Sequence, residues 1–394
     1  MSYILSLLLL FSIFSSLDAK DTEEILVQER ELEAEEDPLL KQKVDMLNNT
    51  KEENTFSYIL YTSIRGRYRH LINEQAVWED YDSRLGINSW YEFFPQTWIF
   101  VRYEAGFNLL KELGLNTDIN YDAFKSGETF YTRLAYVGFQ KDEYILLLGK
   151  NWSTYYQVAS FTDRFSALGG EASGVYNAKS DGGDSGTGRA NDVLQTRLTF
   201  DFTEINLQVQ DKQNIPYIEN AKYNYGFGAS MILNPLKNFK IGLAYNYSKI
   251  NLDSIPLAKR HNLNGNMSAY LLGVQWYSQN WYLGASYSKN YNLQTTDTES
   301  YIDSTGLEVY TQCQVVQNFW FLGGYNYSKP NTYELESKDY LLSYGILGLR
   351  YTIDGFSKMI YMEAKLDQGR IVKHYKSNNQ VILGVRWDFE YSNQ

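Results

Sequence analysis

The sequence predicts an all-β chain that closes into a 16-stranded antiparallel transmembrane β-barrel, and three observations lead to this fold class. First, the 394 residues are 16% aromatic and include 28 glycines but only 6 prolines. Mean hydropathy is −0.42, as expected of strands that are apolar on one face only. Second, side chains alternate in character from residue 58 onward. Third, after the first 19 residues no apolar run approaches the roughly 18–20 residues that a transmembrane helix needs.

The alternation has a period of two. In 238–249, apolar side chains occupy every second position, and glycine, alanine, lysine and asparagine lie between them. The segments 281–288 and 381–389 repeat this arrangement. Aromatic residues at the ends of the apolar face are typical of membrane strands flanked by aromatic girdles. A soluble β-sandwich would also alternate, but its aromatic residues would gather in a core, so the barrel is favoured.

Sixteen such segments can be counted along the chain. They start near residues 58, 82, 97, 129, 143, 190, 203, 222, 238, 265, 280, 307, 318, 338, 357 and 379. Dividing the 337 residues after position 57 by 16 gives about 21 per strand, which fits short turns at one end and longer loops at the other. An even number lets the last strand close against the first, as a bilayer without water at a sheet edge requires.

The N-terminal part differs from the rest. Residues 1–19 are predicted to be a signal peptide, because the apolar run 4–17 ends just before Ala19, although no Lys or Arg precedes it. An uncleaved anchor is the alternative, but the run is short for a membrane span. Residues 20–57 form an acidic periplasmic extension, predicted to be helical or disordered. Of the net charge of −11, −8 lies in residues 1–57 (13 acidic, 5 basic).

Composition also excludes several kinds of function. One cysteine rules out a disulfide framework, and three histidines leave little room for a metal centre, so we expect no metal and no cofactor. The negative charge disfavours nucleic acid as a partner. We expect no enzymatic activity, because His70, His261 and His374 have no recognisable serine or acid partner in the sequence.

A family resemblance enters at the segment 149–156, GKNWSTYY, which continues through FTDRF at 161–165 to GGE at 169–171. This stretch resembles the constriction-loop region of the Gram-negative general diffusion porins, and the resemblance covers residues 58–212. The family implies a trimeric barrel in the cell outer membrane whose third external loop folds inward, here 152–188, with residues 58–391 forming the barrel. It implies passive diffusion of ions and small hydrophilic solutes through a water-filled channel.

The resemblance also implies charged residues on two sides of the constriction. The acidic side is Asp163 and Glu171, with Glu104 at an acidic wall position. The basic side is Arg84, Arg133 and Arg189, together with Arg65, which lies two residues after the family's lysine position. Ala167 stands where the family has a second loop carboxylate. We therefore expect a weaker cation preference than is usual in the family, or a mild anion preference.

The expected partners follow from the same resemblance. The family forms homotrimers, and residues Asp118, Asp122, Lys125 and Glu128 occupy the region that latches onto a neighbouring subunit, with Lys150 at the position such a latch contacts; a solvated loop is the alternative. Outer-membrane lipid and lipopolysaccharide would surround the barrel. The barrel-assembly machinery would read the last strand, which ends near Phe389 with a five-residue overhang. Two other functions remain open, a substrate-specific channel and, less favoured, an outer-membrane barrel enzyme.

Overall fold

The computed structural model describes residues 56–72, 75–114, 130–253, 255–331, 340–369 and 379–393. The predicted signal peptide and acidic extension, and the predicted latch residues Asp118, Asp122, Lys125 and Glu128, lie outside the described residues. His374, one of the three histidines considered above, also lies outside them. Everything that follows concerns the described part of the chain.

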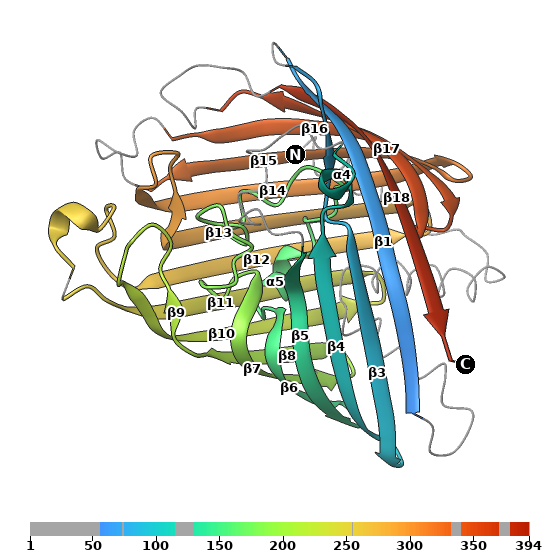
Figure 1. Cartoon of the computed structure of the whole chain (residues 1–394), viewed down its shortest axis with the longest axis horizontal. Helices are drawn as coiled ribbons and strands as arrows, with labels where there is room; N and C mark the ends of the chain where they lie inside the picture. The colour runs from blue at the N-terminus through green and yellow to red at the C-terminus, as the bar shows by residue number, and fades with distance from the viewer. Residues whose placement is uncertain are drawn as a thin grey trace, which may run out of the picture. The chain divides into compact units, whose positions relative to one another are not determined.

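The described residues form one antiparallel sheet that closes into a barrel (Figure 1). Its main strands are β1 (Phe56–Leu71), β3 (Arg84–Phe94), β4 (Thr97–Phe107), β5 (Phe130–Lys141), β6 (Tyr144–Trp152), β7 (Arg189–Phe200), β8 (Thr203–Gln210), β10 (Lys222–Leu236), β11 (Phe239–Asn251), β12 (Met267–Ser278), β13 (Trp281–Thr295), β14 (Tyr301–Val316), β15 (Phe319–Pro330), β16 (Leu342–Asp354), β17 (Lys358–Asp367) and β18 (Gln380–Ser392). Two short strands continue this pairing. β2 (Val77–Asp80) pairs with β1 next to β3, and β9 (Gln213–Asn214) pairs with β10 next to β8.

The prediction of sixteen strands is confirmed, since 18 strand segments less the two short extensions leave 16. The last strand closes against the first, with a register that runs from Ile59 opposite Ser392 to Leu71 opposite Gln380. Most expected starts agree with the observed strands, but β14 begins at Tyr301 rather than near 307. Its first residues are largely polar and continue the ladder beyond the apolar band, so they carry no alternating signal.

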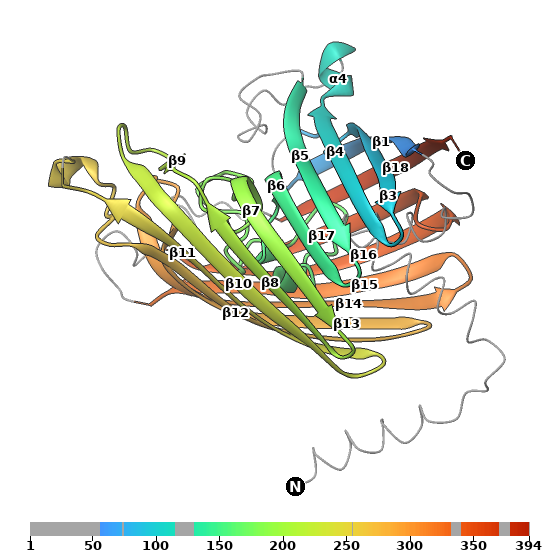
Figure 2. The same ribbon diagram turned by 90° about the horizontal axis from the view of Figure 1, so that it is seen from below.

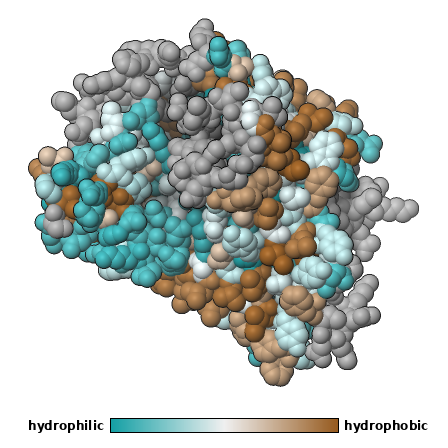
Figure 3. Space-filling view, viewed as in Figure 1, coloured by the Kyte–Doolittle hydropathy of each residue, from teal (hydrophilic) through white to brown (hydrophobic). Residues whose placement is uncertain are grey.

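The two faces of each strand differ as the alternation predicted. Leu243, Leu283 and Leu383 are 47%, 46% and 48% exposed on the outside. Their inward-facing neighbours Ala244 and Ile382 are 7% and 0% exposed. Figure 3 shows apolar side chains gathered over the outer surface of the strands and hydrophilic ones toward the loop end, at the left. The outer surface is therefore suited to lipid.

The connections at the two ends of the barrel are unequal (Figure 2). Pairs of residues such as 142–143, 201–202 and 279–280 make short turns at one end. The longer connections lie at the other end, and the segment 153–188 between β6 and β7 belongs to them. Three short helices interrupt the described connections: α4 (Leu109–Glu112), α5 (Tyr156–Ala159) and the 3-10 helix η1 (Leu257–Lys259).

Among the described residues, no helix combines the length and the apolar character needed to cross a bilayer.

Candidate pore constriction

The connection between β6 and β7, residues 153–188, folds into the barrel and is called the constriction loop below. Its two ends are tied together, because the Ser153 N–H and hydroxyl donate to the Gly188 and Thr187 carbonyls, both at 2.8 Å. From there the loop follows the inner wall from β8 and β10 to β17. The expected inward fold of this loop is confirmed.

A row of glycines makes room for the loop. Six consecutive strands, β10 to β15, each place one glycine beneath it: Gly228, Gly242, Gly273, Gly284, Gly306 and Gly324. A Cβ at Gly284 would lie 2.0 Å from the Phe161 carbonyl oxygen, and one at Gly306 would lie 2.0 Å from that of Ala172. These contacts involve the loop backbone, so the loop can lie flat on the wall only because these side chains are absent.

Two wall carboxylates hold the loop in place. Glu308 of β14 accepts hydrogen bonds from the Ala172 and Ser173 N–H groups at 2.7 and 2.8 Å, and from the Thr162 hydroxyl at 2.7 Å. Glu363 of β17 accepts the Ser166 and Ala167 N–H groups at 2.7 and 3.0 Å. Charge-assisted bonds of this kind are stronger than neutral ones, so the loop backbone is fixed at two points.

Neither Glu308 nor Glu363 was expected at the constriction from the sequence. Each is a charged residue at an inward-facing position of a strand whose neighbours are apolar, Leu307 and Val309 in one case and Met362 in the other. A charged side chain between apolar neighbours in an alternating strand was the available signal. It could have marked both residues as lumenal, but only the folded loop shows what they bind.

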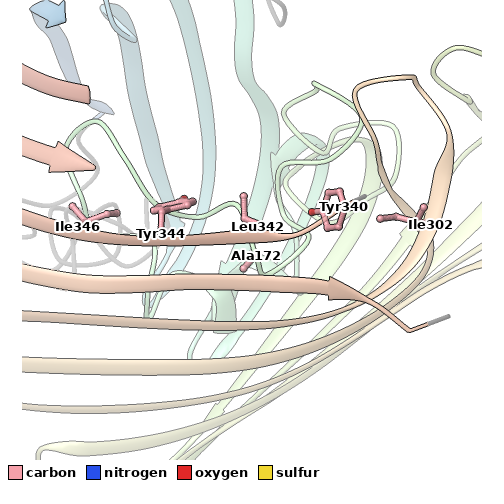
Figure 4. Close-up of a cluster of buried hydrophobic side chains, with 6 residues drawn as sticks. All are labelled: Ala172, Ile302, Tyr340, Leu342, Tyr344 and Ile346. Carbon is pink, nitrogen blue, oxygen red and sulfur yellow. The ribbon is translucent and has the colours of Figure 1, made fainter. Parts of the chain in front are cut away.

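Apolar contacts complete the attachment. Ala172 lies in a buried cluster with Ile302, Tyr340, Leu342, Tyr344 and Ile346, against which Phe165 and Leu168 pack (Figure 4). Ala167 lies in a second cluster with Tyr361 and Ile382. The ring of Phe165 also meets Tyr310 edge-on, with centroids 4.8 Å apart.

Four tyrosines of the wall add to these contacts. They point inward and are almost fully buried: Tyr282, Tyr310, Tyr344 and Tyr361. They lie beneath the constriction loop. Tyr282 donates its hydroxyl to the Phe161 carbonyl at 2.8 Å. They therefore support the loop instead of lining an open path.

The wall formed by β18 and β1 to β5 is lined differently and is called the arginine wall below. Its inner face carries Arg65, Arg67, Arg69, Arg84, Arg102, Arg133 and Arg386. Three of them surround the single carboxylate of Glu104: Arg133 Nε at 2.8 Å, Arg102 Nη2 at 3.2 Å and Arg84 Nη1 at 3.8 Å. The Tyr61 hydroxyl also donates to Glu104 at 2.8 Å. Glu104 is thus in contact with the expected basic residues Arg84 and Arg133, within the wall itself.

Arg65, Arg84 and Arg386 lie on three adjacent strands of this wall. The register places Arg65 of β1 directly opposite Arg386 of β18, and Ser63 opposite Arg84 of β3. Arg386 pairs with Asp388, with Nη2 at 2.5 Å from Oδ2. Arg65 donates from Nε to the Ser63 hydroxyl at 2.8 Å.

The expected loop acid Asp163 is held by two tyrosines of the loop. Its Oδ2 accepts the hydroxyls of Tyr156 and Tyr176 at 3.2 and 2.8 Å. Burial raises the pKa of Asp163 above its ordinary value, and these two hydrogen bonds offset part of the rise. Asp82 raises the pKa of Asp163 further, and Arg189 lowers it.

The structure differs from expectation for the other loop acid, Glu171. Its carboxylate lies 3.8 Å from Lys365 Nζ of β17, and its backbone N–H donates to Asn326 of β15 at 3.3 Å. No contact joins it to the four predicted arginines among the described residues. The loop runs along β14 to β17 at this point, so Glu171 faces that wall.

Arg189 is the first residue of β7 and directly follows the constriction loop. Its Nε is 3.2 Å from Asp181 Oδ2, which Lys150 Nζ also approaches at 3.2 Å. Burial opposes ionisation of Asp181, but Arg189 and Lys150 hold its pKa below the ordinary value. Lys150, expected to meet a neighbouring subunit, therefore has a partner within its own chain. No cluster of possible metal ligands occurs among the described residues.

The comparisons with known proteins agree with this geometry. No family model matches the chain. Outer membrane porin C of Salmonella typhimurium is 28% identical over 230 residues, which are 55% of this chain. The match spans 59% of that porin's length, less than two thirds.

Solved structures share the fold over most of the chain. OmpF of Salmonella typhi, solved in complex with daunomycin, has a TM-score of 0.68 at 19% identity and covers 84% of this chain and 97% of its own. The anion-selective porin of Comamonas acidovorans has a TM-score of 0.62 at 12% identity and covers 86% of this chain and 100% of its own. The chain is thus similar in sequence to part of an outer-membrane porin, and it shares its barrel fold with solved porin structures.

Proposed function

We propose that this chain forms a water-filled channel in the outer membrane, through which ions and small hydrophilic solutes diffuse passively. The observation that carries the proposal is the constriction loop, which is fixed inside the barrel by Glu308 and Glu363. A barrel of this strand number encloses a lumen wide enough for water, so a loop attached to one wall narrows the passage without closing it. This function includes no chemical step, and we propose that the protein is not an enzyme.

We propose that selectivity arises between Asp163 on the loop and the arginines of the facing wall, with Glu104 as the carboxylate within that wall. Fixed charges at close quarters decide which ions pass a pore. Positive charge on the wall comes from Arg65, Arg84 and Arg133. Arg189, directly after the constriction loop, adds a further positive charge. Ala167 adds no carboxylate to the loop tip, where it is buried against Tyr361. These features support the expectation of a weak cation preference or a mild anion preference.

We further propose that the working unit is a homotrimer embedded among outer-membrane lipid and lipopolysaccharide. The apolar outer face of the strands supports contact with lipid and with neighbouring copies. The last strand supports reading by the barrel-assembly machinery, because Phe389 and Tyr391 both point outward near its end, at 48% and 64% exposure.

Single-channel recording in a planar bilayer tests this function. Detergent-purified protein is added at graded KCl concentrations, and conductance steps are recorded. A diffusion channel gives steps that scale with bulk conductivity, and a trimer gives closures in three equal levels. Absence of steps would overturn the channel proposal.

The competing function, a substrate-specific channel, predicts a conductance that one neutral solute class blocks at low concentration. Aromatic tracks serve sugar channels, but the inward tyrosines here are buried under the loop, which does not favour this alternative. Block by a sugar at a concentration that leaves bulk conductivity unchanged would revive it.

A further inference from the structure

We propose that Arg67 is a positioning residue that, together with Glu363, holds the tip of the constriction loop (residues 164–168) on the barrel wall and so fixes the width of the passage. This inference rests on the proposed channel function and deepens it. It gives Arg67 a role different from the selectivity proposed for the arginines that face the passage.

A single residue of the tip, Ala167, is bound by an acid and by a base. Its N–H donates to the Glu363 carboxylate of β17 at 3.0 Å, and its carbonyl oxygen accepts Nη1 of Arg67 of β1 at 3.4 Å. The Ser166 N–H donates to the same carboxylate at 2.7 Å. Each charged group thus meets the backbone group of opposite partial charge, an arrangement that favours both contacts.

Arg67 is held in the orientation that this contact requires. Its side chain is fully buried, and its Nε donates to Glu79 of β2, which is 1% exposed. The guanidinium carbon lies 3.7 Å from the centroid of the Tyr81 ring, which follows β2. A planar guanidinium that is paired along one edge and stacked on a ring has little freedom to turn. Glu79 and Tyr81 therefore direct Nη1 toward the tip.

The side chain of Ala167 takes part in the same contact. It is 5% exposed and lies in the buried cluster with Tyr361 and Ile382, against which Tyr81 packs. Tyr81 therefore contacts both the cluster that contains the tip and the guanidinium of Arg67. A carboxylate in place of Ala167 would be buried among these rings, at a high cost. The small tip residue and the attachment of the tip are thus linked.

Arg67 extends the attachment of the loop as far as β1. Glu308 of β14 and Glu363 of β17 hold the loop along one wall, whereas Arg67 belongs to the arginine wall. β18 pairs with both β17 and β1, so the tip is held on neighbouring strands. A tip that lost the Arg67 contact could move off the wall into the passage. The contact therefore keeps the passage at one width.

Hydrogen exchange of the loop amides tests this contact directly. In the detergent-purified protein, the Ser166 and Ala167 amides exchange when the tip leaves Glu363. Arg67→Met keeps a long side chain but removes Nη1. Exchange of both amides should become about 5-fold faster, as expected for the loss of one hydrogen bond.

The loop contains its own reference for a wider loss of structure. The Ala172 and Ser173 amides are bound by Glu308, at a separate point of the loop. Their exchange should stay within about 2-fold of wild type in Arg67→Met, because local opening at the tip leaves this point closed. Equally faster exchange at both points would contradict a specific role at the tip.

A milder variant decides the question if Arg67→Met does not fold. Arg67→Lys keeps the charge but loses the planar fork, so one ammonium cannot bind Glu79 and the Ala167 carbonyl in the same way. Exchange of the tip amides should then rise about 2-fold, less than in Arg67→Met. Wild-type exchange of these amides in Arg67→Lys would refute the assigned contact.

Single-channel current connects the contact to the passage. The tip of Arg67→Met enters the passage more often, so the open-state current variance should rise about 5-fold, in step with the detached fraction. Arg84→Met is the matched control, because it removes a guanidinium of the same wall whose ion pair is with Glu104. It should shift the reversal potential in a KCl gradient and leave the variance within about 2-fold of wild type. Arg67→Met should shift the potential less, since its charge is buried beside Glu79.

Failure of the inference is distinct from failure of the channel function. Normal conductance steps with wild-type tip exchange in Arg67→Met, or with equal current variance in Arg67→Met and Arg84→Met, would overturn the role of Arg67 alone. Absence of steps in the wild type would overturn the channel. The exchange measurement would still decide the tip contact in that case, because it requires no current.

Discussion

The inner surface of this barrel has two contrasting regions. From β10 to β17 the wall offers glycines and two carboxylates, and the constriction loop covers it. From β18 through β5 the wall carries seven arginines: Arg65, Arg67, Arg69, Arg84, Arg102, Arg133 and Arg386. Both regions have the same alternating strands and the same apolar outer face. The outward-facing residues therefore specify a barrel, whereas the inward-facing residues determine which wall the loop packs against and which wall lines the passage.

Loss of Glu308 should break this comparison most strongly. Glu308→Ala leaves the Ala172 and Ser173 N–H groups and the Thr162 hydroxyl without their acceptor, and each buried unpaired group costs about 1–3 kcal/mol. The loop should detach from the wall, so that conductance becomes noisier and larger solutes enter. Liposome swelling with sugars of increasing size measures this. Glu308→Gln, which keeps acceptor oxygen, should show a smaller change, and an unchanged size limit in Glu308→Ala would contradict the assigned role.

A side chain added to the glycine row should have the next largest effect, and in the opposite direction. In Gly306→Ala the new Cβ would lie only 2.0 Å from the Ala172 carbonyl oxygen, so the loop must move into the lumen. Single-channel conductance should fall. Gly345→Ala is the matched control, because its Cβ would meet only a backbone oxygen at 3.9 Å. Equal conductance in the two variants would show that the glycines do not set the loop position.

Reversal of one charge on the arginine wall should have a moderate effect. Arg65→Glu places a carboxylate beside Arg84 and Arg386, so the preference should shift toward cations. The reversal potential in a tenfold KCl gradient reports this shift. Lys240→Glu, which makes the same change of charge on β11, should shift it less because the loop does not narrow the passage at the short-turn end. An equal shift in both variants would mean that net charge alone sets selectivity.

Acidification should produce the smallest effect. Burial raises the pKa of Asp163, so this carboxylate is charged above its raised pKa and becomes neutral as pH falls through it, before an ordinary aspartate would. Asp181, whose pKa is lowered by Arg189 and Lys150, stays charged over the same range. Cation permeability should therefore fall at mildly acidic pH in the wild type. Asp163→Asn should start at the lower value and lack this step, whereas persistence of the step in Asp163→Asn would assign it to another group.

The strand count, the outward and inward faces and the bounds of the loop could all be predicted from the sequence. Each is local, because a period of two is written into consecutive residues and a long segment without it marks the loop. The predicted start of β14 near 307 was late, since Tyr301 to Thr305 extend the strand beyond the apolar band and carry no alternation. Arg84, Arg133 and Glu104 were each expected at the constriction from the family resemblance; the structure brings them into contact, and their part in selectivity stays a prediction.

What the sequence by itself determined is therefore a closed barrel of alternating strands with a long connection after β6. Only the tertiary structure decided where that connection lies. The side chains that hold it, Glu308 and Glu363, are more than 130 residues from the loop atoms they bind. The position of Glu171 over β15 and β17, away from the arginines, follows from the same distant contacts. Pairings across the lumen depend on barrel closure and register, which bring remote strands together and leave no local pattern in the chain.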